Sequence, residues 1–147
     1  MKPNEVLLDT SAFINYPQLA WRQPPDWFSM VVLQELLVGG SDKSSIAKYQ
    51  ALKIGYERRG RLLTPDADAW WQAGKILGHF LSDLSRGKVG RRRPQLDQGH
   101  KQSLIRDVLI AVTAKQHGLT VVSDNKDFPL LQGYYKFKWI AAREFFA

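Results

Sequence analysis

The chain has 147 residues, 44% of them hydrophobic, no cysteine, and a net charge of +7. This length suits one compact domain over residues 1–147, and the hydrophobic fraction is too high for a disordered chain. No apolar run approaches the ~20 residues that span a membrane, and no signal peptide is evident, so we expect a cytoplasmic protein. The lack of cysteine excludes disulfides and thiolate metal ligands, and the basic charge predisposes the chain to polyanionic partners.

The first half of the chain alternates short apolar runs with helical patterns. Residues 6–8 indicate a buried strand, and three prolines predict a loop or an interrupted helix over residues 16–27. Residues 30–33 are typical of a second strand, followed by a helix or turn that stops at Gly39-Gly40. Residues 42–59 carry apolar side chains at helical spacing and predict a helix.

The second half continues this alternation. Residues 61–63 form a candidate strand, and Thr64-Pro65-Asp66 has the hydroxyl cap, proline and acid of a helix start. A second helical pattern covers residues 102–117, and Gly118 ends it. Residues 119–123 indicate a buried strand, and a last strand is a candidate around Phe137 and Trp139.

Short apolar strands that alternate with helices predict an α/β domain with a largely parallel sheet. In such sheets, ligands bind beyond the carboxyl ends of the strands. Asp9 and Asp124 each follow a predicted strand directly. We therefore expect both at the same edge of the sheet.

Two further acids, Glu35 and Asp107, lie in apolar surroundings, where an unpaired carboxylate is costly to bury. One such acid alone has an ordinary explanation, because it can cap a helix or pair with an arginine. Arg106 is adjacent to Asp107, so the two side chains point apart on a helix. The residues three and four positions from Asp107 are Ser103, Leu104, Ile110 and Ala111. None is basic, so no local helical ion pair explains Asp107.

Several acids at one sheet edge would repel one another and would each have a raised pKa unless a cation were present. Carboxylate oxygens are the ligands that Mg²⁺ and Mn²⁺ prefer. The spacing of the acids does not establish that they converge, and only the strand-end argument supports it. The sequence therefore leaves a shared metal site and separate structural roles both open.

Four segments, taken together and in order, resemble PIN-domain ribonucleases: residues 6–13, 31–39, 105–111 and 118–128. Many members of that family are toxins of the VapC kind from bacterial toxin–antitoxin pairs. The resemblance implies a three-layer α/β/α domain, with a central, mostly parallel sheet flanked by helices.

By this resemblance, Asp9, Glu35 and Asp107 match the three core acids of the family. The fourth position is ambiguous, because relatives often have Thr-x-Asp or Thr-x-Asn where this chain has Ser123-Asp124-Asn125. We include Asp124 in the expected catalytic and metal-binding set. Asn125 is an alternative for that position, and Asp127 can approach through a water.

The resemblance implies a Mg²⁺- or Mn²⁺-dependent endoribonuclease that hydrolyses RNA phosphodiester bonds, with an antitoxin protein as a possible partner and a homodimer as the expected assembly. The alternative is a catalytically weak PIN-like module that binds RNA or protein in a larger assembly. Thr10 and Ser11 can contact water or phosphate at the site, or simply cap the following helix. Ser123 is expected to support the site.

One feature departs from the family core, and a pair of tryptophans needs a separate interpretation. A basic loop over residues 85–100 can contact an RNA backbone, contact an acidic partner protein, or be solvated. Its basic residues are Arg86, Lys88, Arg91, Arg92 and Arg93. Trp70 and Trp71 are adjacent on a predicted helix, and packing in the core or at a dimer interface is favoured over base stacking.

Overall fold

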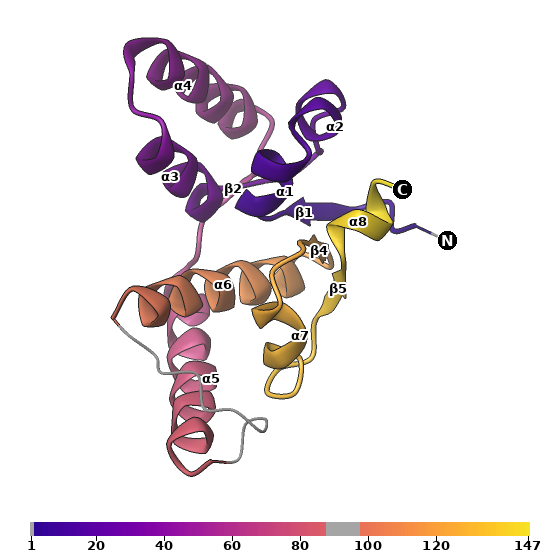
Figure 1. The fold of residues 1–147 in the computed structure, drawn as a ribbon. Helices are drawn as coiled ribbons and strands as arrows, with labels where there is room; N and C mark the ends of the chain where they lie inside the picture. Colours follow the sequence, from indigo (N-terminus) through magenta and orange to yellow (C-terminus); the bar gives the residue numbers. More distant parts are fainter. Residues whose placement is uncertain (1, 88–97) are drawn as a thin grey trace.

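The computed structural model describes residues 2–87 and 98–147 (Figure 1). Its elements in chain order are β1 (Val6–Leu8), α1 (Thr10–Asn15), α2 (Pro17–Arg22), β2 (Phe28–Ser29), α3 (Met30–Gly39), α4 (Lys43–Arg58), β3 (Leu62–Leu63), α5 (Ala67–Ser85), α6 (Gln98–Gln116), β4 (Thr120–Val122), α7 (Asp127–Leu131), β5 (Lys138–Ile140) and α8 (Ala142–Phe145). No helix within these described ranges is long and apolar enough to cross a membrane.

The central sheet has the strand order β1-β4-β5, and both pairings are parallel. Leu7 pairs with Val121, which pairs in turn with Trp139. Every residue of β1 and β4 is buried, as expected for parallel strands covered on both faces. The strands β2 and β3 form a separate parallel pair.

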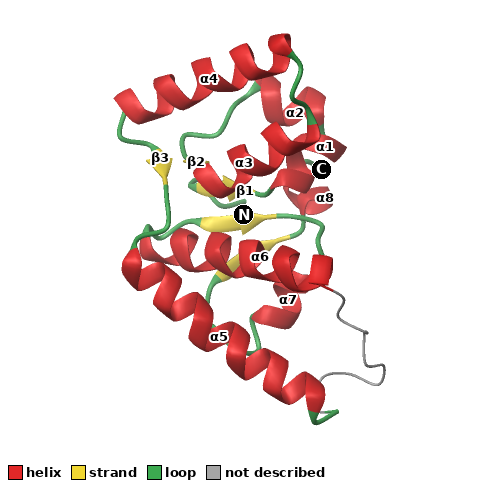
Figure 2. Cartoon of the chain, turned by 90° about the vertical axis from the view of Figure 1, so that its left-hand side faces the viewer, coloured by secondary structure: helices red, strands yellow, loops and turns green. Residues whose placement is uncertain are grey.

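Helices cover both sides of the sheet. In Figures 1 and 2, α5 and α6 lie below the strands and α1 to α4 lie above them. The predicted α/β fold, with a parallel sheet flanked by helices, is therefore confirmed.

The helix α6 is the most deeply buried helix described. Every residue from Asp107 to Ala114 is buried, because α6 lies between the sheet and α5. A helix that is apolar on all sides belongs in the interior of a domain. Gly118, with a φ of 68°, ends the turn that leads into β4, and this left-handed conformation favours glycine. The fold thus places Asp107 in the core.

The prediction of a strand over residues 30–33 was wrong. The strand β2 is only Phe28–Ser29, and Met30 already begins α3. The Ser29 hydroxyl caps α3 by accepting a hydrogen bond from the Val32 N–H, at 3.4 Å. A short apolar run fits a buried strand and a buried helix equally well, so the capping hydroxyl was the more informative signal.

The start of α5 also differs from the prediction. Asp66 rather than Thr64 caps the helix, because its carboxylate accepts a hydrogen bond from the Ala69 N–H at 2.7 Å. This start leaves Trp70 and Trp71 on the outside, 56% and 68% exposed. Packing of either indole in the core of this chain was therefore a wrong expectation.

Candidate active site

Three different elements supply the predicted core acids. Asp9 directly follows β1, and its backbone N–H donates to the Val122 carbonyl at 3.0 Å. Glu35 lies in the middle of α3, and Asp107 lies in the middle of α6. The side chains of Asp9 and Asp107 are buried, and that of Glu35 is three-quarters buried.

The electrostatics of these acids show that they share one environment. Burial raises the pKa of Asp107 to about 9, and the negative charges of Asp9, Asp127 and Glu35 add to this effect. Burial and the charge of Asp9 raise the pKa of Glu35, although the Arg106 guanidinium opposes them. The structure therefore brings Asp9, Glu35 and Asp107 close enough to influence one another strongly.

Asp9 itself is held by hydroxyl groups. Burial raises its pKa, and hydrogen bonds from Ser123 and Ser11, with the N–H groups of Thr10 and Ser11, partly offset that rise. Ser123 Oγ donates to Asp9 Oδ2 at 2.8 Å, and Ser11 Oγ donates to the same oxygen at 3.1 Å. The Trp139 indole N–H donates to the Ser123 carbonyl at 3.0 Å. These contacts fix one oxygen of Asp9 in position.

The turn after β4 brings Asn125 and Asp127 to the three acids. We call Asp9, Glu35 and Asp107, with the polar residues that contact them, the acidic group. The Asn125 N–H donates to Ser123 Oγ at 2.9 Å, and Asn125 Nδ2 donates to Asp107 Oδ2 at 3.1 Å. Asn125 Oδ1 accepts from the Asp127 N–H at 3.0 Å. Asn125 thus connects three residues of the group through its backbone and side chain.

Asp124 is not brought into the acidic group. Its Oδ2 accepts a hydrogen bond from the Tyr16 hydroxyl at 2.7 Å, and its Oδ1 accepts one from the Arg143 N–H at 3.1 Å. The Arg143 guanidinium lies 3.6 Å from Oδ1. Partial burial opposes ionisation of Asp124, but these contacts outweigh it and leave its pKa below the ordinary value. Our assignment of Asp124 to the catalytic set therefore finds no support in its contacts.

Sequence reasoning missed two basic partners of the site. Arg106 Nε lies 3.6 Å from Glu35 Oε2, and His100 Nε2 lies 3.4 Å from Asp127 Oδ2. The sequence spacing shows that Arg106 does not pair with Asp107, because adjacent side chains on a helix point apart. Nothing local indicated that it would meet Glu35, because α3 and α6 are far apart in sequence.

The basic loop can be placed only in part. Arg86 follows α5 and is exposed. Lys88, Arg91, Arg92 and Arg93 lie outside the described residues, so the predicted contact of this loop with RNA stays a prediction.

The residues of the acidic group fit a hard divalent cation. Two buried oxygens in it, Glu35 Oε1 and Thr10 Oγ1, make no well-formed hydrogen bond, although Thr10 is close enough to Glu35 to lower its pKa. The side-chain atoms that could bind the cation are carboxylate, hydroxyl and amide oxygens, which hard cations prefer. The charge of Asp9 raises the pKa of Glu35 and of Asp107, and a bound cation would offset that repulsion. Among the residues that the structure describes, no group of three or more His, Asp or Glu side chains is placed so that it could hold a metal ion.

A sequence profile described as PIN domain matches residues 6–133, which is most of the chain. The chain belongs to the PIN-domain family. Its resemblance to that family, inferred from four short segments, is thereby confirmed. A search of curated proteins found no match.

Solved structures of toxin–antitoxin proteins share this PIN fold. The VapBC-5 structure from Mycobacterium tuberculosis matches with a TM-score of 0.53 and 26% identity, over 95% of this chain and 99% of that chain. VapBC-1 from nontypeable Haemophilus influenzae matches with a TM-score of 0.55 and 20% identity, over 94% and 98%. The DNA-bound VapBC from Salmonella typhimurium matches with a TM-score of 0.52 and 20% identity, over the same shares.

Proposed function

We propose that this PIN domain is a Mg²⁺- or Mn²⁺-dependent endoribonuclease that hydrolyses RNA phosphodiester bonds. The observation that carries the proposal is the convergence of Asp9, Glu35 and Asp107 from three elements. Burial raises the pKa of all three acids, and the charges of neighbouring carboxylates add to the rise at Glu35 and Asp107. Arg106 relieves part of this repulsion, but the pKa values of Glu35 and Asp107 stay raised. Perturbed acids that keep their repulsion are typical of functional sites.

Each residue of the group has a distinct role in this proposal. Asp9 is the central ligand, and Asp107 and Glu35 complete the set of carboxylates that would hold the ion. When bound, the ion would activate water and neutralise charge on the phosphoryl oxygens. Glu35 Oε1, which is buried without a partner, is available to the ion or to the attacking water.

The remaining polar residues act as positioning groups. Ser123 and Ser11 orient Asp9 through its Oδ2, and Arg106 restrains Glu35. Asn125 takes the fourth position in place of Asp124, because it contacts Asp107 directly, and Asp127 contributes charge from the start of α7.

The biological context we propose is the toxin of a toxin–antitoxin pair. Support comes from the 26% identity to a VapBC-5 protein over nearly the whole chain. An antitoxin protein is accordingly the proposed partner, and a homodimer the proposed assembly.

One observation favours a second candidate, a catalytically weak module that binds RNA or protein. The fourth position holds the amide of Asn125 rather than a carboxylate, and this amide donates to Asp107. An amide brings no negative charge to the site, so it would bind an ion less tightly than an acid does.

RNA cleavage tests the proposal. Purified wild type is incubated with a pool of structured and single-stranded RNA in Mg²⁺, in Mn²⁺ and in EDTA, beside Asp9→Asn and Asp124→Asn. We expect wild type and Asp124→Asn to cleave only with metal, and Asp9→Asn not to cleave. Folded wild type that cleaves nothing in either metal, or Asp9→Asn that cleaves like wild type, would overturn the assignment.

A further inference from the structure

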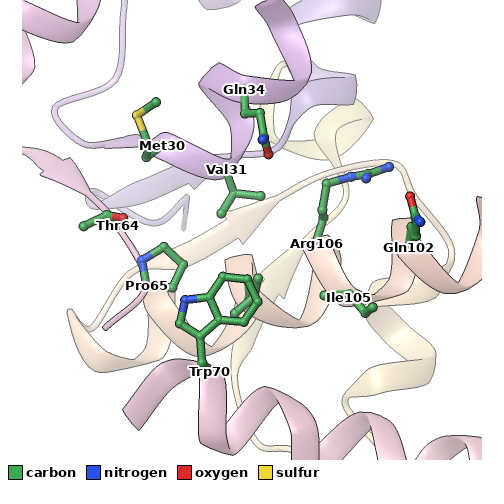
Figure 3. A pocket seen from close by; sticks show the side chains of 10 residues that line it. Met30, Val31, Gln34, Thr64, Pro65, Trp70, Gln102, Ile105 and Arg106 are labelled. Carbon is green, nitrogen blue, oxygen red and sulfur yellow. The ribbon is translucent and has the colours of Figure 1, made fainter. Parts of the chain in front are cut away.

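A pocket of about 380 Å³ lies beside the acidic group, between α3, the start of α5, and α6 (Figure 3). The side chains that matter for its chemistry are Val31, Gln34, Trp70, Gln102, Ile105 and Arg106. The proposed catalytic set does not use this pocket.

One guanidinium joins the pocket to the acidic group. Arg106 lines the pocket, and its Nε lies 3.6 Å from Glu35 Oε2. The same Nε is buried and makes no well-formed hydrogen bond. Gln34, another lining residue, immediately precedes Glu35 on α3. A ligand in the pocket therefore lies next to any group bound at the acids.

The lining has the three kinds of contact that a nucleotide requires. Figure 3 shows the Trp70 indole at one end, near Pro65, while Gln34, Arg106 and Gln102 lie toward the other end. The indole is 56% exposed, so a flat apolar surface is open to a ligand. Carboxamides can both donate to and accept from the edge of a base, and a guanidinium can bind a phosphate.

We propose that this pocket binds a nucleotide of the RNA adjacent to the scissile phosphate. The base stacks on Trp70, its edge meets the amide of Gln34 or Gln102, and a backbone phosphate lies beside Arg106. This inference rests on the proposed function, because it places RNA at the acidic group. It makes Trp70 a determinant of RNA affinity, and the two glutamines determinants of base preference.

The chain contains a matched control for this role. Trp71 is the next residue on α5 and is 68% exposed, but it is not part of the pocket lining. Trp70→Ala and Trp71→Ala therefore each remove one exposed indole from the same helix. Only the first removes the proposed stacking surface. Neither indole is in the core, so both variants should melt like wild type, as circular dichroism would verify.

The test measures binding separately from cleavage. Fluorescently labelled oligo(A), oligo(C) and oligo(U) ribonucleotides are titrated, with anisotropy as the readout, into full-length Asp9→Asn protein in EDTA. We expect Trp70→Ala to weaken binding by at least about fivefold, which is the lower end of the affinity that stacking one base on an aromatic ring contributes. Trp71→Ala should change affinity by less than about twofold. Gln34→Ala should alter the preference among the three oligonucleotides more than it alters the average affinity for them.

Two results would overturn the proposal. One is unchanged RNA binding by Trp70→Ala, and the other is an equal loss in both tryptophan variants. If RNA binding is unchanged and light scattering shows a different oligomeric state for Trp70→Ala, the occupant of the pocket is a second copy of the chain.

The two proposals fail separately. If wild type does not cleave RNA but only Trp70→Ala loses RNA binding, the nuclease fails and the pocket stands as a site that binds RNA without cleaving it. If wild type cleaves RNA and Trp70→Ala binds normally, the pocket fails and the nuclease stands.

Discussion

Asp9 and Asp124 both lie just beyond a parallel strand, yet they end in opposite environments. The strands β1 and β4 are neighbours in the sheet, but Asp9 directly follows β1, whereas Asp124 is the second residue after β4. Asp9 is buried among acids and has a raised pKa, whereas Asp124 is partly exposed and has a lowered one. A position at the end of a strand therefore brings a carboxylate to the right edge without deciding which way it faces.

The difference arises from side-chain alternation and from the partners on each side. In extended chain, successive side chains point to opposite faces. Ser123 and Asn125 point toward Asp9 and Asp107, while Asp124, between them, points to Tyr16 and Arg143. Asp9 and Asp107 lie among hydroxyl groups and other acids, whereas Asp124 accepts a hydrogen bond from the Tyr16 phenol and lies beside the positive charge of Arg143.

The largest expected contrast is in catalysis. Asp9→Asn should reduce metal-dependent RNA cleavage on the order of a thousandfold, as when a preorganised electrostatic group is removed from a reaction site. Asp124→Asn should stay close to wild type. Initial rates under identical metal and RNA conditions measure both. A comparable loss in Asp124→Asn would mean that the two strand ends act together.

The second contrast is in how stability depends on pH. The folded-state pKa of Asp107 is raised to about 9, so the folded protein binds more protons than the unfolded chain between pH ~4 and pH ~9. Stability should therefore fall as pH rises through this window, by on the order of a few kcal/mol in EDTA. Chemical denaturation across that range should show the loss in wild type and a much smaller one in Asp107→Asn. A flat profile in wild type would contradict the burial of interacting acids.

A smaller effect should follow from Asn125→Ala. This change removes the amide that donates a hydrogen bond to Asp107 and accepts one from the Asp127 N–H, but it leaves every carboxylate in place. We expect a loss of roughly 10- to 100-fold in activity or metal affinity, typical of a group that orients metal ligands. Kinetics at several Mn²⁺ concentrations would measure it. Full activity at low Mn²⁺ would show that Asn125 is dispensable.

The smallest effect concerns the stability of Asp124→Asn. The substitution weakens the contacts with Tyr16 and Arg143, so we expect a loss of about 1 kcal/mol in the free energy of unfolding. Because the pKa of Asp124 is lowered, its contribution is present at neutral pH and is lost as pH falls through the folded-state pKa. Urea denaturation at neutral pH and near pH 3 measures the difference. A variant that is equally destabilised at both pH values would contradict this origin.

The fold could be predicted from the sequence because its central elements are strongly patterned. Residues 6–8 and 119–123 contain the buried runs that became β1 and β4, and the residues from Asp107 to Ala114 are mostly apolar and all buried in α6. The start of α3 could not be predicted, because four apolar residues suit either structure and only the Ser29 cap decides.

The candidate site could be predicted less completely. The apolar surroundings of Glu35 and Asp107 and the strand-end position of Asp9 drew attention to these three acids, but only the resemblance to PIN-domain ribonucleases grouped them in one site. The choice among Asp124, Asn125 and Asp127 depended on the directions of side chains in a turn. Those directions follow from contacts with Tyr16 and Arg143, which are distant in sequence.

Calorimetric titration with Mn²⁺ tests the central claim most directly, because it needs no knowledge of the RNA target. Wild type, Asp107→Asn and Asp124→Asn are titrated near neutral pH in buffers of different ionisation enthalpy. We expect wild type and Asp124→Asn to bind Mn²⁺ with similar affinity and to release protons, since the raised pKa of Asp107 keeps that carboxyl protonated before binding. Asp107→Asn should bind much more weakly and release fewer protons. Loss of Mn²⁺ binding in Asp124→Asn, or no binding by folded wild type, would contradict a metal site formed by Asp9, Glu35 and Asp107.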